Sequence, residues 1–198
     1  MNSNSVKTTF ATMAVMLVAV CAFQTRSAQS SSATTSETAP KPLLLEKNEG
    51  ERRTWREPPP GEFMLKVSPK NNGSQHLVMG TEDMAPGDEI PTHKHLGQDE
   101  ILLIEKGTAH VYLGDQERDL HAGGIVFIPA YTWVSVKNAG TETVSLAFVF
   151  SAPGFENLMR CESVLPNENP TPISPEEHKD CDHQGHVVYK GREESPKK

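Results

Sequence analysis

Two histidines and one glutamate stand close together near the middle of the chain. His93 and His95 are separated by one residue, and Glu100 follows five residues after His95. In an extended segment, residues i and i+2 point to the same face, so the two imidazoles converge. If Glu100 opens the next strand, two nitrogens and one carboxylate oxygen meet, a set that suits Fe(II), Mn(II), Zn(II) or Ni(II). The alternative is that both histidines lie in a solvated loop.

The segments that must position these residues are short and rich in Val, Ile, Leu and aromatic side chains. Turn signals such as Asn72-Gly73, Lys106-Gly107 and Gly123-Gly124 separate them at intervals of roughly 8–12 residues, which is typical of an all-β sandwich or barrel. The predicted strands are 63–67, 76–82, 100–104, 108–113, 124–128, 133–137 and 144–150. Two short C-terminal helices are also predicted, one around 155–160 and one that begins at Pro175 with Ser174 as its N-cap.

A longer pattern of fixed spacing surrounds the two histidines. It reads Gly87, five residues, His93, one residue, His95, four residues, Glu100, six residues, Gly107. Chance would produce these five residue types at this spacing on the order of once per million starting positions. In this pattern the chain resembles the cupin family, whose first motif it completes. Gly123 and Pro129 match the start of that family's second motif, which continues with Gly, His and Asn where this chain has Tyr131, Val134 and Asn138. The resemblance covers roughly residues 62–151.

The resemblance implies a double-stranded β-helix, an RmlC-like jelly-roll barrel in which the two motifs face each other across the interior. It also implies metal ligands, because in metal-binding cupins the first-motif His pair and Glu act with a second-motif His. By this resemblance His93, His95 and Glu100 are the ligands. The position of the fourth ligand holds Val134, which has no lone pair to donate.

The absence of the fourth ligand leaves three interpretations of function. Three ligands with open coordination positions resemble the two-His-one-carboxylate site of non-haem iron oxygenases. A metal-dependent isomerase or lyase would need a general acid or base, and the sequence assigns that role to no residue. Alternatively, Val134 marks a degraded metal site in a non-catalytic cupin that binds a small molecule, or the barrel exterior docks a protein partner.

The C-terminal segment holds further candidate ligands, namely His178, Cys181, His183 and His186. One of them could supply the missing ligand, or together they could form a separate zinc site. A solvated tail with a disulfide between Cys181 and Cys161 is the more economical interpretation in an oxidising compartment.

Two aromatic residues and a basic segment complete the candidates. Tyr131 and Trp133 bracket the position where, by the resemblance, most cupins have a small residue before the ligand. They could stack on a substrate, or else pack at the barrel rim or a dimer interface. Arg52, Arg53 and Trp55 precede the barrel, either as a solvated arm or as a strand added to a sheet edge.

The N-terminal residues predict export. A short polar start is followed by an apolar run from Phe10 to Phe23, shorter than the roughly 20 residues of a membrane-spanning helix. We therefore predict a signal peptide at 1–28, with a short membrane anchor as the alternative. A disordered linker at 29–41, an N-terminal arm at 42–61, the barrel at 62–151 and a C-terminal tail at 152–198 follow.

Composition limits the class of partner. The chain has 198 residues and a formal net charge of −7, which argues against nucleic-acid binding because phosphate neutralisation needs clustered Lys and Arg. We expect an exported protein, periplasmic or secreted, with one divalent metal, a small-molecule ligand and no stable membrane anchor once the signal is removed. The resemblance further implies a homodimer, in which the segment 43–45 (Leu-Leu-Leu) could cross to the partner.

Overall fold

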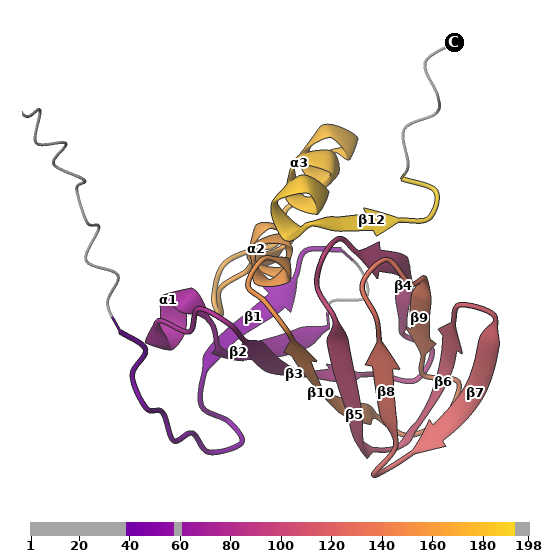
Figure 1. The fold of residues 1–198 in the computed structure, drawn as a ribbon. Helices are drawn as coiled ribbons and strands as arrows, with labels where there is room; N and C mark the ends of the chain where they lie inside the picture. Colours follow the sequence, from indigo (N-terminus) through magenta and orange to yellow (C-terminus); the bar gives the residue numbers. More distant parts are fainter. Residues whose placement is uncertain (1–38, 58–60, 193–198) are drawn as a thin grey trace, which may run out of the picture. The chain divides into compact units, whose positions relative to one another are not determined.

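A computed structural model describes residues 39–57 and 61–192 of the chain. These residues form two antiparallel sheets that face each other, one of seven strands and one of five (Figure 1). The fold is the predicted all-β, jelly-roll-like barrel with a few short helices. The predicted signal peptide and nearly all of the predicted linker lie outside the described residues.

The seven-stranded sheet has the order β11-β1-β2-β3-β10-β5-β8. Its strands are β1 (Glu51–Trp55), β2 (Glu62–Val67), β3 (Val78–Met84), β5 (Glu100–Lys106), β8 (Ile125–Ile128), β10 (Val144–Phe150) and β11 (Ser163–Val164). The basic-aromatic segment before the barrel is therefore a strand, because β1 pairs with β2 on one side and with β11 on the other.

The five-stranded sheet has the order β12-β4-β9-β6-β7. Its strands are β4 (Glu89–His95), β6 (Thr108–Leu113), β7 (Gln116–His121), β9 (Val134–Lys137) and β12 (Val187–Tyr189). β12 comes from the C-terminal segment and pairs with β4, so the strand that carries the two histidines lies between two neighbours.

The core fills the space between the sheets. On β5 the buried residues Leu102 and Ile104 alternate with the exposed residues Ile101 and Leu103, the period-2 pattern of a strand with one inward face. On β10 almost every residue is buried, and Phe148 occupies space next to Gly80 on β3, where an added Cβ would lie 2.4 Å from the Phe148 ring. This close approach explains a glycine in the middle of a strand.

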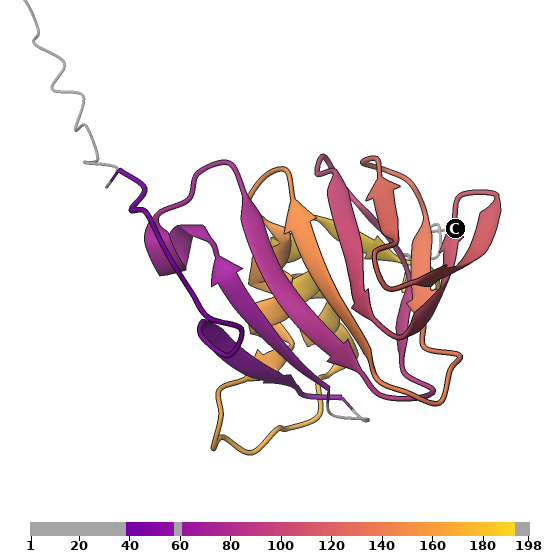
Figure 2. The ribbon, with the colours of Figure 1, turned by 90° about the horizontal axis from the view of Figure 1, so that it is seen from below.

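Three helices accompany the sheets: α1 (Pro69–Asn72), α2 (Phe155–Cys161) and α3 (Pro175–Gly185). α3 begins as predicted, because the Ser174 hydroxyl accepts a hydrogen bond from the Glu177 amide at 3.1 Å. α2 and α3 lie against one face of the seven-stranded sheet (Figure 2) and are joined by a disulfide between Cys161 and Cys181. In the described part of the chain, no helix is both long and apolar enough to span a membrane.

Candidate metal site and ligand cavity

The two motif histidines lie near the end of β4 and point into the barrel. β4 alternates in burial at this end, so His93 and His95 are 4% and 1% exposed while Lys94 between them reaches outward. Pairing of β4 with β9 on one side and β12 on the other fixes the strand from both edges. The two imidazole ring centroids are 4.9 Å apart.

Glu100 approaches the histidines from the other sheet. It is the first residue of β5, is 6% exposed, and places Oε2 3.0 Å from His95 Nε2. One ligand atom from each of His93, His95 and Glu100 lies within 4.8 Å of the others. Within residues 39–57 and 61–192, this is the one group of three potential ligands found with such spacing.

A hydrogen bond orients the His93 ring, and burial keeps it uncharged. His93 Nδ1 donates to the Pro91 carbonyl oxygen at 2.7 Å, which leaves the lone pair of Nε2 free. Burial, helped by the neighbouring His95, lowers the pKa of His93 to about 3. The imidazole is therefore uncharged at neutral pH, the form that binds metals.

The donor set fits a borderline divalent metal. Two imidazole nitrogens and one carboxylate oxygen are ligands that Fe, Mn, Zn and Ni share. Two ligands about 2.1 Å from a metal, at right angles to each other, are about 3 Å apart, which is the separation of His95 Nε2 and Glu100 Oε2. The other His95 nitrogen, Nδ1, is buried without a hydrogen-bond partner among the described residues.

Val134 occupies the place of the missing ligand. It is the first residue of β9, is 1% exposed, and is the Cα partner of His93 in the β4–β9 ladder. The second-motif Asn138 lies at the end of the same strand and has a structural role, since its Nδ2 donates to the carbonyl oxygens of Met84 and Glu142.

The C-terminal candidates do not gather into a second metal cluster within the described residues. Cys181 is in the disulfide with Cys161. His178 lies between the Glu57 and Glu162 carboxylates at 2.8 and 2.5 Å. The same segment nevertheless contributes to the site, because Tyr189 on β12 packs over His93 with ring centroids 5.4 Å apart.

A cavity of about 230 Å³ lies beside the histidine–glutamate cluster. His93 and Glu100 line it together with an apolar wall from both sheets and α2. That wall is made by Leu102, Ile128, Val134, Val136, Leu146, Phe148, Phe150, Phe155 and Met159. The chain therefore encloses a small, mainly apolar space against the candidate ligands, the usual form of a small-molecule site.

The aromatic residues proposed from sequence to contact a substrate lie away from this cavity. Tyr131 is 65% exposed, and Trp133 stacks under the Lys94 ammonium group, 4.5 Å from the ring centroid. Neither is among the cavity-lining residues, so their contact with a ligand stays a prediction. The aromatic rings next to the histidines are instead Phe150, Phe155 and Tyr189.

Tyr131 shows a further departure from the second motif, which has glycine at this position. Its φ is 66°, in the left-handed region that glycine enters without strain. Gly107 of the first motif has a φ of 80°, and an added Cβ would lie 2.8 Å from the Thr143 carbonyl oxygen. The motif glycine is thus required by backbone geometry, and at 131 a tyrosine adopts the same conformation.

Glu82 is a cavity-lining carboxylate that the sequence did not single out. It lies on β3 opposite Phe63 and Leu146, both buried, and so faces inward with them. The Trp55 indole N–H donates to Glu82 Oε1 at 2.8 Å. Burial, followed by repulsion from Glu100 and two aspartates, raises the pKa of Glu82 to about 7. The sequence does not mark Glu82 as inward, because its direction depends on the register of β3 against β2 and β10.

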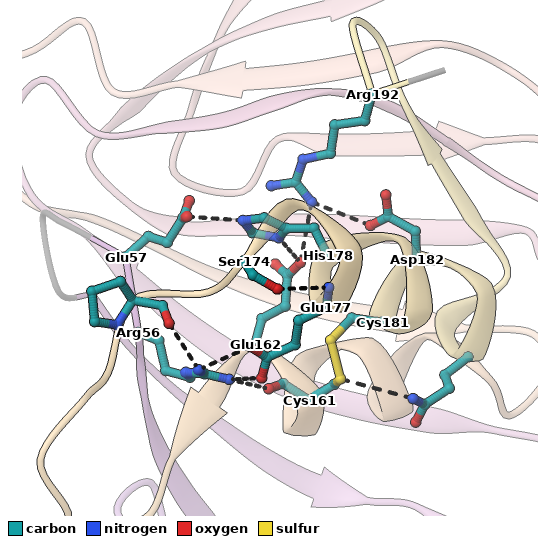
Figure 3. A network of polar contacts seen from close by, with 12 residues as sticks. Arg56, Glu57, Cys161, Glu162, Ser174, Glu177, His178, Cys181, Asp182 and Arg192 are labelled. Atoms are coloured by element: carbon teal, nitrogen blue, oxygen red, sulfur yellow. Dashed lines mark hydrogen bonds and ion pairs between the residues drawn. A yellow bond between two sulfur atoms is a disulfide. The ribbon is translucent and has the colours of Figure 1, made fainter. Parts of the chain in front are cut away.

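A network of charged groups links α2, α3 and Arg192, which follows β12 (Figure 3). Arg192 donates to the Glu162 and Asp182 carboxylates at 3.1 and 3.2 Å, and its guanidinium lies 4.5 Å from the Tyr189 ring centroid. Glu162 also contacts His178, which extends the network to Glu57. These contacts connect α2, α3 and β12 and hold Tyr189 over His93.

Comparisons with known proteins agree with this architecture. The cupin domain family matches residues 80–150. A predicted oxalate decarboxylase from Thermotoga maritima is 18% identical with a TM-score of 0.50, covering 56% of this chain and all of its own. KdgF from a Halomonas species is 15% identical with a TM-score of 0.48, and the match covers 57% of this chain and 96% of KdgF. An RmlC-like cupin from Shewanella frigidimarina is 16% identical with a TM-score of 0.47, and the match covers 58% of this chain and 94% of that cupin.

The family match covers one segment of 71 residues within the 198 of the chain. Comparison with curated proteins gave no significant match. The matched segment, 80–150, contains the complete first motif, the partial second motif and the strands β3 to β10. Residues 80–150 therefore form a cupin domain.

Proposed function

We propose that this chain is an exported cupin that binds one divalent metal through His93, His95 and Glu100 and acts on a small organic substrate in the adjoining cavity. The observation that carries the proposal is the convergence of the three ligand atoms, within 4.8 Å of one another, at the wall of a 230 Å³ cavity. The family resemblance of the motif supports the same ligand set.

Each residue has a defined part in this function. His93 and His95 bind as neutral imidazoles, with His93 oriented by the Pro91 carbonyl, and Glu100 contributes the negative charge. The apolar wall of the cavity excludes water and holds the carbon skeleton of the substrate. The metal, when bound, supplies Lewis-acid or oxygen-activating chemistry at the cavity wall.

A second candidate function is favoured by Val134. A buried valine in place of the fourth ligand weakens metal affinity and makes the cavity wall more apolar. In this alternative the chain binds a small molecule without catalysis and without a metal. Metal content therefore separates the two candidates.

The decisive experiment is metal analysis of the purified protein by inductively coupled plasma mass spectrometry. We expect close to one equivalent of Fe, Mn, Zn or Ni per chain, and loss of at least nine tenths of it in His93→Ala. His110→Ala is the matched control, because His110 lies on β6, contacts Asp119 at 2.6 Å and does not line the cavity. Metal-free protein after reconstitution with all four metals would support the binding module instead.

Export and self-association complete the proposal. The disulfide between Cys161 and Cys181 supports an oxidising compartment, periplasmic or extracellular. A homodimer is supported by four exposed apolar side chains on the outer face of β5 and β8, which are Ile101, Leu103, Ile125 and Phe127. The predicted signal peptide at 1–28 would direct the export.

A further inference from the structure

The cavity contains an inward carboxylate that the metal site does not use. Glu82 lies on β3, in the seven-stranded sheet, and its ladder partners Phe63 and Leu146 belong to the hydrophobic core. Glu82 is half-buried among these neighbours, so its carboxylate is partly desolvated and gains from an interaction inside the cavity.

Only one of the two carboxylate oxygens of Glu82 accepts a hydrogen bond from the described residues. Glu82 Oε1 accepts the Trp55 indole N–H at 2.8 Å. Among the described residues, Oε2 has no hydrogen-bond donor and no Lys, Arg or His within ion-pair distance. Because Glu82 lines the cavity, this second oxygen is available to a molecule inside it.

Most of the charged residues that line the cavity are acidic. Besides Glu82 and the proposed metal ligand Glu100, acidic residues at its wall include Asp83, Asp88 and Glu89. Among the described lining residues the one Lys or Arg is Arg192, which is already held by Glu162 and Asp182. The proposed metal would offset the charge of Glu100, but beside Glu82 an anionic group would meet repulsion, whereas an ammonium group would be attracted.

We propose that Glu82 binds the ammonium group of a small, mainly apolar amine, whose carbon skeleton packs against the apolar wall of the cavity. Glu82 Oε2 accepts a charge-assisted hydrogen bond from the ammonium, while Trp55 holds the other oxygen in place. The inference rests on the proposed function in placing the ligand in the same cavity. It adds the class of ligand and a residue that selects it.

Three probes of similar size test this selectivity: benzylamine, benzyl alcohol and benzoate. Each carries one phenyl ring, and they differ in the charge of the polar group. Affinities are measured by ligand-observed NMR titration at pH 7.5 on wild-type protein, with metal content determined in the same sample. We expect benzylamine to bind at least about tenfold more tightly than benzoate, with benzyl alcohol between them.

Glu82→Gln is the critical variant, because glutamine still offers an oxygen to the Trp55 indole N–H but carries no charge. We expect it to weaken benzylamine binding by about tenfold and to change benzyl alcohol binding by less than about threefold. Glu105→Gln removes the same charge from an exposed position on β5 and should leave all three affinities unchanged. Trp55→Phe should retain the preference for the amine.

The inference is overturned if benzylamine fails to bind, if benzoate binds as tightly, or if Glu82→Gln preserves the full preference for benzylamine. These outcomes are separate from failure of the metal proposal. If the wild-type protein is metal-free but binds benzylamine, and Glu82→Gln loses that binding, the amine site is supported and the metal site is refuted. If the protein carries metal but prefers benzoate, the metal site is supported and the amine site is refuted. Melting temperatures of each variant confirm that it is folded.

Discussion

His93 and Val134 face each other as Cα partners across the β4–β9 ladder, so the side chain at 134 projects toward the candidate metal site from the neighbouring strand. Both side chains line the same cavity. A metal-ligating side chain at 134 would therefore join His93, His95 and Glu100 at the cavity wall. In this chain the apolar side chain of Val134 lies at that place instead.

This relationship predicts the effect of restoring the fourth ligand. Val134→His should increase Zn(II) or Ni(II) affinity by at least about tenfold, because an additional neutral nitrogen completes the ligand set. In metal-free buffer the same variant should lose about 1–3 kcal/mol of stability, since it buries an unpaired polar ring. Competition with a chromophoric chelator measures affinity, and urea unfolding measures stability. Unchanged affinity would show that position 134 does not face the metal.

The raised pKa of Glu82, about 7, predicts how stability depends on pH. The folded state holds this proton more tightly than the unfolded state, whose pKa is close to 4.5. The resulting stabilisation is fully present below about pH 4.5 and is lost as pH rises through about 7. In Glu82→Gln this contribution is absent at every pH. The stability of the variant relative to wild type should therefore increase between pH 4.5 and 8, measured by urea unfolding in metal-free buffer. A constant difference would contradict the burial of this carboxyl group.

The disulfide predicts a large contribution to stability. Cys161 and Cys181 are separated by 20 residues, and closure of such a loop stabilises a fold by about 3 kcal/mol in the chain-entropy description. Replacing both cysteines with alanine should lower the free energy of unfolding by about that amount. Wild-type protein unfolded with and without a reductant provides the matched comparison, and equal stability in the two conditions would count against a formed disulfide.

The backbone of Tyr131 predicts an unusual preference for glycine. At φ 66°, glycine avoids the clash between Cβ and the backbone that any other residue incurs. Tyr131→Gly should therefore be more stable than Tyr131→Ala by about 1 kcal/mol, although both remove the same exposed ring. Thermal unfolding of the two variants measures this difference. If alanine proves the more stable, the left-handed conformation at 131 is wrong.

The proposed homodimer predicts a specific sensitivity at the outer face of β8. Phe127 is 55% exposed and pairs with Ile101, itself 43% exposed. Phe127→Glu should convert a dimer to a monomer, because it places a charge in the centre of this apolar face. Tyr112→Glu introduces the same charge at an exposed position of the other sheet and should leave the dimer intact. Light scattering after size-exclusion chromatography distinguishes the species, and a monomeric wild-type chain would refute the proposal.

Most of the barrel was predictable because its strands carry their own hydrophobic pattern. Strands β5, β6 and β10 begin where the sequence placed them, since branched and aromatic side chains alternate there or run continuously between turn signals. The first-motif spacing likewise predicted that His93, His95 and Glu100 approach one another. Both kinds of signal depend on residues close together in sequence.

The strands that the sequence did not predict depend on backbone pairing with their neighbours. β7 is largely charged, and β4 contains a proline and polar residues, so neither shows the apolar pattern of a strand. β12 has three residues and depends on β4 for its hydrogen bonds. Glu82 was overlooked for a related reason. Its inward direction follows from the register of β3 against β2 and β10, which only the folded sheet defines.

The pairing of β12 with β4 has a consequence for solubility. Without β12, the strand that carries His93 and His95 would expose a free row of backbone donors and acceptors, and such an edge recruits strands from other molecules. β12 follows directly after α3, which the disulfide ties to α2. Reduction of one covalent bond therefore loosens the segment that protects this edge. We expect reduced protein to self-associate through β4 while most of the barrel is still folded.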